Sequence, residues 1–304
     1  MALTSVTAYK TVEMVILALL GVVSFKCGIV DEQLNKKLSN LVLSVFTPIL
    51  LFISLQKTIS QELLHGLLIS ALLAVLSFLV IWFLSKLTVM KQSRDHAIVE
   101  HISLMYSNCG FIGIPMAQGI WGTDGVFYMT AYVALANFLL WTHGVIMFSG
   151  KKDFKSVEKV FRSPTIIAIV LGLIFFLIQL ELPKIVREPM EMIASVNTPM
   201  AMMVAGINIA QADLRQVFIK LRTYFICFIK LIIMPLSLIH ILSFIPVDQT
   251  IKTVIVLACA CPSGVTGSLF ALKFDKDAIY ASEIFAMTTI LSIVTVPFMM
   301  IFCS

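Results

Sequence analysis

The sequence has few charged residues. Only 13% of its 304 residues are charged and 59% are hydrophobic, which is about half the charged fraction of an ordinary soluble domain. A chain with so little polar surface cannot cover itself against water, so part of its solvent must be lipid. It also lacks a long polar segment, because the longest polar gap, residues 151–162, is only a short linker. We therefore expect no separate soluble domain.

The sequence also lacks the motifs of the common enzyme classes. It contains no H-E-x-x-H, G-x-S-x-G or Walker A pattern and no paired intramembrane aspartates, so we predict neither an enzyme nor an ATP-driven pump. Its six cysteines lie within or beside apolar segments and predict no disulfide framework. Cys259 and Cys261 form an isolated C-x-C, which is weak evidence for a metal. Packing of small residues is the favoured interpretation, and we expect no cofactor.

Apolar runs, in contrast, recur along the whole chain. They span residues 12–29, 41–55, 63–85, 97–121, 125–149, 164–182, 189–210, 223–245, 251–272 and 278–303. Most reach the roughly 20 residues that a helix needs to cross a bilayer, and none alternates with period two. The first run lacks a basic start and a cleavage site, so we interpret it as a retained span. The pattern predicts an all-α polytopic membrane protein with ten transmembrane helices.

The basic residues are distributed unevenly between the two sides of the predicted membrane. With ten spans, the termini and the even-numbered connections lie on one side of the membrane. That side carries 5 Lys and Arg residues, and the opposite side carries 16. Only Lys230 lies within a span. The positive-inside rule puts the basic side in the cytoplasm. We therefore predict a multi-pass protein of the cell membrane with both termini outside. The net charge of +5 is explained by this topology and predicts no nucleic-acid partner.

The two halves of the chain resemble each other at an offset of about 151 to 152 residues. SVFTPILLFISL (44–55) aligns with SVNTPMAMMVAG (195–206), and Cys109 aligns with Cys261. Each half holds five spans, an odd number, so the second half must enter the membrane in the opposite orientation. The alignment predicts two inverted five-helix repeats, residues 1–152 and 153–304, a plan that many secondary transporters use.

Helix-breaking residues interrupt the fourth and ninth spans at matching places. The first interruption is predicted at Asn108 to Pro115 and the second at residues 258–268, around Pro262. Asn108 lies about 17 Å into its span, near the membrane midplane. Freed backbone groups at that depth must face protein or water, and half-helices that start after Pro115 and Pro262 offer N–H groups to a carboxylate. Kinks used only for packing are the alternative, but a matched pair favours a site.

The remaining polar residues within spans allow more than one interpretation. Lys230 can neutralise an anionic substrate, pair with a carboxylate or extend its amine to the cytoplasmic surface. Asn137 can join helices, which is slightly favoured, or line a substrate path. Glu283 is either interfacial or a buried, proton-carrying carboxylate. For His143 and His240, interfacial packing is favoured over a proton relay.

Three motifs together resemble the auxin efflux carrier family, which includes bacterial malonate and malate permease-like members and the plant PIN carriers. They are SNCGFIGIPMAQGIWG (107–122), FIKLIIMPLSL (228–238) and Pro262-Ser263-Gly264. The resemblance covers the whole chain. The long cytoplasmic loop of the plant carriers is absent, which favours a bacterial-type carrier. Cys109 stands where many members have a small hydroxyl residue, so the substrate preference can differ.

The resemblance implies that helices 4 and 9 cross at their proline breaks. It also implies a scaffold of helices 1, 2, 6 and 7 beside a moving transport part of helices 3–5 and 8–10, an elevator-like cycle, and a homodimer. From it we predict a secondary transporter for a small organic anion, a mono- or dicarboxylate, with protons or sodium as candidate coupling ions. The predicted substrate-binding residues are Asn108, Cys109, Gly110, Pro115, Asn137, Lys230, Pro262, Ser263 and Gly264.

Within this prediction, Asn108 and the Ser263-Gly264 backbone hold the carboxylate while Lys230 supplies positive potential. Three alternatives remain open at the level of the sequence. A sodium-coupled carrier resembling the bile-acid symporters shares a ten-span crossed architecture and would stop when sodium is removed. A channel would show flux that does not saturate, and a membrane receptor would bind its ligand without moving it.

Overall fold

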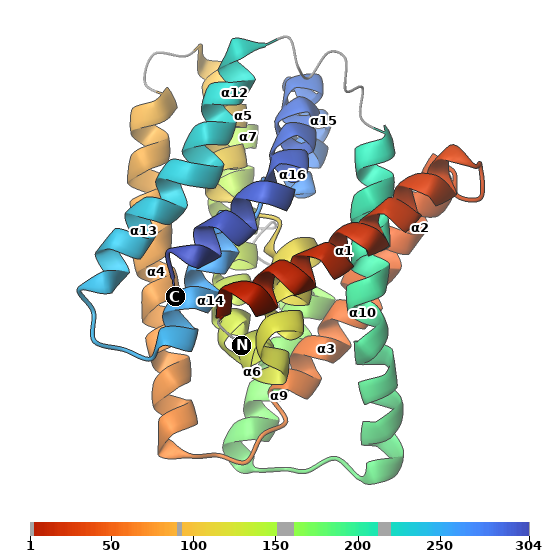
Figure 1. Ribbon diagram of the computed structural model, residues 1–304, viewed down its shortest axis with the longest axis vertical. Coiled ribbons are helices and arrows are strands. Elements are labelled where there is room, and N and C mark those ends of the chain that lie inside the picture. Colours follow the sequence, from red (N-terminus) through yellow and green to blue (C-terminus); the bar gives the residue numbers. More distant parts are fainter. Residues whose placement is uncertain (1–2, 90–92, 151–160, 212–219, 304) are drawn as a thin grey trace.

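The chain folds into a bundle of helices. The computed structural model describes residues 3–89, 93–150, 161–211 and 220–303 (Figure 1). Within these ranges there is no strand, only one isolated antiparallel bridge, between Ser107 and Ser263. The predicted all-α class is therefore confirmed. The predicted boundary between the repeats, at residues 152 and 153, lies outside the described residues.

Eight α-helices and three π-helical turns make up the described chain up to residue 178. The α-helices are α1 (Leu3–Lys26), α2 (Glu32–Leu41), α3 (Thr47–Ser54), α4 (Gln61–Val89), α5 (Arg94–Met105), α6 (Ile114–Leu139), α7 (Val145–Ser149) and α9 (Pro164–Ile178). The π-helical turns are Val42–Phe46, Cys109–Gly113 and Leu140–Gly144.

The rest of the described chain continues in the same way. Its α-helices are α10 (Lys184–Gln211), α12 (Leu221–Phe228), α13 (Met234–Ser243), α14 (Gln249–Ala260), α15 (Val265–Lys273) and α16 (Ala278–Ile301), with a π-helical turn at Ile229–Ile233.

Six helical segments in the described residues are long and apolar enough to cross a membrane. They are Glu32–Ser54, Gln61–Val89, Cys109–Ser149, Lys184–Gln211, Leu221–Ser243 and Ala278–Ile301, and Pro164–Ile178 and Gln249–Ala260 are shorter apolar helices. The segment Cys109–Ser149 contains a non-helical residue, Gly122, with φ 62° and ψ −144°, a conformation that favours glycine. Gly122 lies between the fourth and fifth apolar runs of the sequence. The structure is thus that of a multi-pass membrane protein.

Several helices begin at side chains that cap them. Asp31 accepts a hydrogen bond from the Leu34 N–H at the start of α2, and Asp277 accepts one from the Tyr280 N–H at the start of α16. Asp248 and Ser163 cap α14 and α9 in the same way. Such caps satisfy N–H groups that the first helical turn leaves free. They fix where these helices begin.

Three of the π-helical turns end two residues before a proline, at Pro48, Pro115 and Pro235. In the turn before Pro115, the N–H of Ile114 donates to the carbonyl of Cys109, five residues back. A proline ring clashes with the carbonyl four residues before it in a regular α-helix. The wider turn relieves this clash, so the helix continues through the proline without ending.

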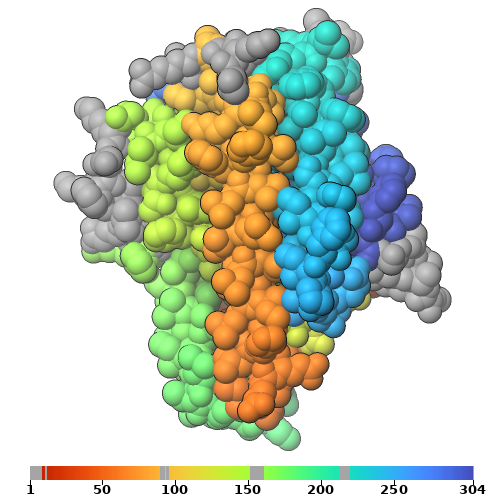
Figure 2. All heavy atoms as spheres, turned by 90° about the vertical axis from the view of Figure 1, so that its left-hand side faces the viewer, coloured from red at the N-terminus to blue at the C-terminus, as the bar shows by residue number. Residues whose placement is uncertain are grey.

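The helices gather into two groups of contacts. Helix α10 packs against α1 and α3, and α3 also packs against α9; α4 packs against α5, α6 and α14, while α16 packs against α12 and α15. In Figure 1, α10 lies at the right and α4 and α13 at the left. Figure 2 shows α4 running along one face of the molecule. Its Leu68, Leu72 and Leu79 are 58%, 69% and 60% exposed, as expected of a face that lipid covers.

The closest packing between α1 and α10 depends on two glycines. A Cβ atom at Gly206 would lie 1.8 Å from the Ala18 carbonyl oxygen, and one at Gly21 would lie 2.1 Å from that of Met203. We expect Gly206→Ala to destabilise the protein by about 1–3 kcal/mol, because the helices must separate. Thermal unfolding in detergent measures this. Gly110→Ala is the control, since its nearest neighbour would be 3.9 Å away; equal melting temperatures for both variants would contradict the prediction.

Candidate functional site

Two interrupted helices meet near the centre of the bundle. The first interruption separates α5, which ends at Met105, from the π-helical turn that begins at Cys109, and the second separates α14 from α15. The Asn108 N–H donates to the Pro262 carbonyl at 2.7 Å, and the Gly264 N–H donates to the Tyr106 carbonyl at 2.8 Å. These bonds flank the bridge between Ser107 and Ser263. Each interruption therefore satisfies backbone groups that the other has freed.

The residues at this crossing suit the close approach of two backbones. A Cβ atom at Gly264 would lie 3.3 Å from the Tyr106 carbonyl oxygen, tighter than most such contacts. Pro262 has no N–H to satisfy, and its carbonyl accepts the bond from Asn108. The Ser263 N–H donates to the Thr288 hydroxyl at 3.2 Å. The crossing is thus held to α16 as well.

A cavity of about 120 Å³ lies beside the crossing. Its wall is formed by Leu43, Thr47, Ser107, Asn108, Cys109, Gly110, Phe111, Val133, Ala136, Asn137, Leu140, Thr165, Gly264, Val265 and Thr266. None of these described residues is charged. The helical segments that begin at Cys109 and at Val265 both start at this wall, so the positive ends of two helix dipoles meet at one cavity.

Five of the predicted substrate-binding residues line the cavity: Asn108, Cys109, Gly110, Asn137 and Gly264. The Asn137 amide donates to the Val133 carbonyl at 2.9 Å, within its own helix. Asn108 is mostly buried, with 8% of the residue exposed. None of the hydrogen bonds among the described residues involves its side-chain amide. Because Asn108 also lines the cavity, its side-chain amide is free to bind a ligand there.

Pro115, Pro262, Ser263 and Lys230 do not line the cavity. The predicted position of the first half-helix is wrong, because it begins at Cys109, six residues before Pro115. Pro115 instead lies in the first turn of α6, where the preceding π-helical turn accommodates it. The second half-helix begins at Val265, shortly after Pro262, as predicted. The Ser263 hydroxyl is buried and has no partner among the described residues.

Lys230 is completely buried behind the crossing. Its Nζ donates to the Leu104 carbonyl at 3.0 Å and to the Ser107 hydroxyl at 2.7 Å. Among the described residues its Nζ pairs with no carboxylate, and the side chain is fully buried and does not extend to the surface. The structure therefore contradicts both of those interpretations. The amine instead satisfies a carbonyl at the end of α5, and Ser107, which accepts its second hydrogen bond, lines the cavity.

The sequence did not single out the hydroxyl residues of the cavity wall. Thr47 is the first residue of α3, directly after a π-helical turn. Thr165 lies at the start of α9, and Thr266 lies in α15. Thr47 belongs to the repeated SV-x-TP motif and donates to Asn197 at 2.8 Å, so the repeat was a usable signal for it. Thr165 had no such signal. Glu283 is buried and paired with Lys220 at 2.7 Å.

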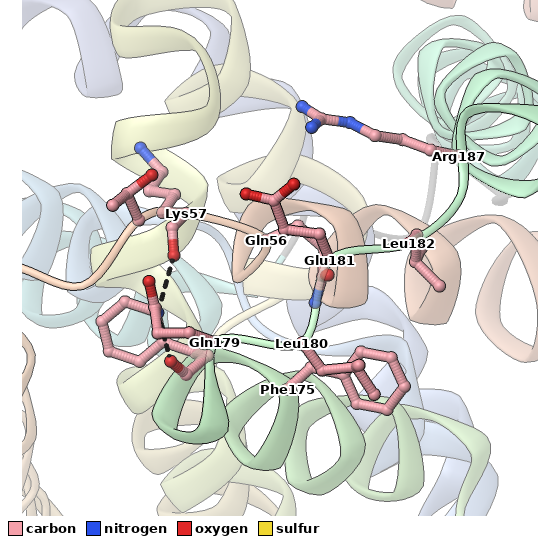
Figure 3. Close-up of a pocket in the computed structure, with 10 residues that line it drawn as sticks. Gln56, Lys57, Phe175, Gln179, Leu180, Glu181, Leu182 and Arg187 are labelled. Carbon is pink, nitrogen blue, oxygen red and sulfur yellow. Dashed lines mark hydrogen bonds between the residues drawn. The ribbon is translucent and has the colours of Figure 1, made fainter.

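A second cavity, of about 60 Å³, lies between the α3–α4 and α9–α10 connections (Figure 3). The Gln179 side chain accepts a hydrogen bond from the Ile59 N–H at 2.8 Å and donates to the Lys57 carbonyl at 3.3 Å. The Lys57 ammonium is paired with Asp124, and burial lowers the pKa of this ammonium. Because these polar groups already bind one another, we place the candidate site at the helix crossing.

Comparison with known proteins agrees with this architecture. The family model described as "Membrane transport protein" matches residues 7–159 and 153–300. The chain is 24% identical over 287 residues to an uncharacterised transporter of Methanocaldococcus jannaschii, covering 90% of this chain and 92% of the relative. It is 23% identical over 297 residues to the uncharacterised transporter YfdV of Escherichia coli, covering 93% of each. The chain therefore belongs to the membrane transport protein family that includes the auxin efflux carriers.

Proposed function

We propose that the protein is a secondary transporter that moves a small organic anion, a carboxylate, across the cell membrane. The observation that carries this proposal is the meeting of two helix N-termini at one cavity. Each N-terminus is equivalent to roughly half a positive charge, and together they suit one carboxylate in a site without charged side chains. The amide of Asn108 would add a directed hydrogen bond.

The transport cycle we propose is elevator-like. Leu43, Thr47 and Thr165 reach the cavity from the π-helical turn before α3, from α3 and from α9. The rest of the wall comes from the interrupted helices, from α6 and from the π-helical turn that follows α6. In the proposed plan of ten spans in two inverted repeats, α1, α2–α3, α9 and α10 form the scaffold and the other helices move. A substrate bound between these two parts would face each side of the membrane in turn. A homodimer, with both termini outside, completes the proposal.

The test begins with a panel of carboxylates. A carboxylate that binds the folded protein raises its melting temperature by mass action, and the strongest binder becomes the substrate for uptake into proteoliposomes. Saturable uptake with counterflow supports a carrier, whereas non-saturating flux would indicate a channel. Loss of uptake on removal of sodium would favour the sodium-coupled alternative.

Asn108→Ala is expected to weaken binding of that carboxylate about tenfold or more, because a hydrogen bond to a charged group contributes about 1.5–3 kcal/mol. Pro262→Ala is expected to lower transport by loosening the crossing. Asn40→Ala, which removes an exposed amide from α2, is the matched control. Transport at the wild-type rate by correctly inserted Asn108→Ala and Pro262→Ala proteins would contradict the proposed site.

A further inference from the structure

Lys230 is a buried amine without an anionic partner. An ammonium has three hydrogen-bond donors, and the two acceptors that Lys230 contacts, the Leu104 carbonyl and the Ser107 hydroxyl, are both neutral. Among the described residues, no carboxylate forms a salt bridge with its Nζ. A buried charge is costly unless it is paired, so the charged form of Lys230 needs compensation that the described protein does not supply.

The groups around Lys230 confirm that this compensation is missing. Its π-helical turn packs against α12, α13, α14 and α16. The titratable groups that act on the amine are the thiols of Cys109, Cys259 and Cys261. The buried carboxylates on neighbouring helices are already paired, Glu100 with Arg222 and Glu283 with Lys220. The described residues therefore supply no free carboxylate for a charged Lys230, and a bound anion could take that place.

The cavity is where such an anion would bind. Ser107 both lines the cavity and accepts the 2.7 Å hydrogen bond from Lys230. A hydroxyl accepts and donates hydrogen bonds, so Ser107 can pass a proton between water in the cavity and the lone pair of the amine. Ser107 would thus connect the Lys230 amine to the cavity in which an anion binds at the helix N-termini.

We infer that Lys230 is the site of a coupling proton, so that the carrier binds one proton together with its anion. The inference rests on the proposed function and names its coupling ion. Anion binding favours the protonated amine, and by linkage the protonated amine favours anion binding to the same extent. The loaded site is then neutral, since the ammonium balances the carboxylate. No covalent bond changes; a proton from water moves through Ser107 to Nζ.

Calorimetry on the purified protein tests this inference. Titrations with propionate, lactate, benzoate and malonate, between pH 7 and 9 and in buffers of different ionisation enthalpy, count the protons taken up per bound anion. These carboxylates stay ionised in this range, so any uptake comes from the protein. We expect up to about one proton per anion and, at the pH of that uptake, a Kd that rises about tenfold per pH unit.

Two variants distinguish a proton-binding role of Lys230 from a purely structural one, in which its amine only satisfies the Leu104 carbonyl. Lys230→Met should bind without proton uptake and more weakly, and Lys230→Arg, which keeps a charge that does not titrate, should bind without uptake and without pH dependence. Binding by the wild type with no uptake at any pH would overturn the inference and leave the proposed function intact, even if Lys230→Met failed to fold. Full uptake by Lys230→Met would overturn it as well. A wild type that bound none of the four anions would contradict the proposed function and this inference together.

Discussion

Arg222→Met is expected to lower the free energy of unfolding by about 3–5 kcal/mol, because it leaves the Glu100 carboxylate buried without its cation. Glu100 is completely buried, and the Arg222 guanidinium donates to its two oxygens at 2.9 Å and 2.6 Å. Thermal or denaturant unfolding of the detergent-solubilised protein measures the loss.

The same carboxylate also ties several helices together. The Tyr280 hydroxyl of α16 donates to Glu100 at 2.8 Å, and Arg222 of α12 donates to the Thr88 carbonyl of α4 at 2.9 Å. Four helices, α4, α5, α12 and α16, therefore meet at one ion pair. In the proposed elevator, all four belong to the moving part, and this network would hold them together as one body.

Two controls isolate the effect of burial. Arg187→Met breaks the Arg187–Glu191 pair, whose side chains are 49% and 43% exposed, and should cost less than about 1 kcal/mol. The double variant Arg222→Met with Glu100→Met should recover much of the loss, since no buried charge remains. Equal costs for Arg222→Met and Arg187→Met would show that Glu100 finds compensation elsewhere.

The sequence predicts local features of this protein better than long-range ones. Apolar runs, glycines and prolines are local signals, and they placed the interruptions near Asn108 and Pro262, where the backbones do cross. The start of the first half-helix was misplaced because a proline alone does not reveal that a π-helical turn before it lets the helix continue. The carboxylate of Glu100 and its partner Arg222 are separated by 122 positions, and no local pattern joins them.

Charged residues near span ends show the same limit. Arg222 is one of the 16 basic residues that mark the cytoplasmic side in the topology prediction, although its guanidinium binds a buried carboxylate. Lys230 was recognised as unusual, but its contacts with Leu104 and Ser107 depend on where a helix more than a hundred residues away is interrupted. Apolar periodicity and charge counts carry no information on such pairings.

Gly110→Leu is expected to reduce transport to background while the protein folds normally. Gly110 lines the cavity, and a Cβ atom there would have only Leu43 Cδ2 nearby, at 3.9 Å. A leucine side chain can therefore enter the cavity without strain and would occupy much of its roughly 120 Å³. Uptake into proteoliposomes and binding of the identified carboxylate measure the effect, and the melting temperature reports on folding.

The size series at this position distinguishes a blocked site from a damaged fold. Gly110→Ala adds one methyl group and should reduce transport less than Gly110→Leu, whereas Ala71→Leu, which adds bulk at an exposed position on α4, should leave transport unchanged. Because the neighbouring backbone of Gly110 is helical, leucine should not lower stability there. A stable Gly110→Leu protein that transported at the wild-type rate would show that the substrate binds outside this cavity. The helix N-termini at the cavity wall would then serve only to hold the two interrupted helices together.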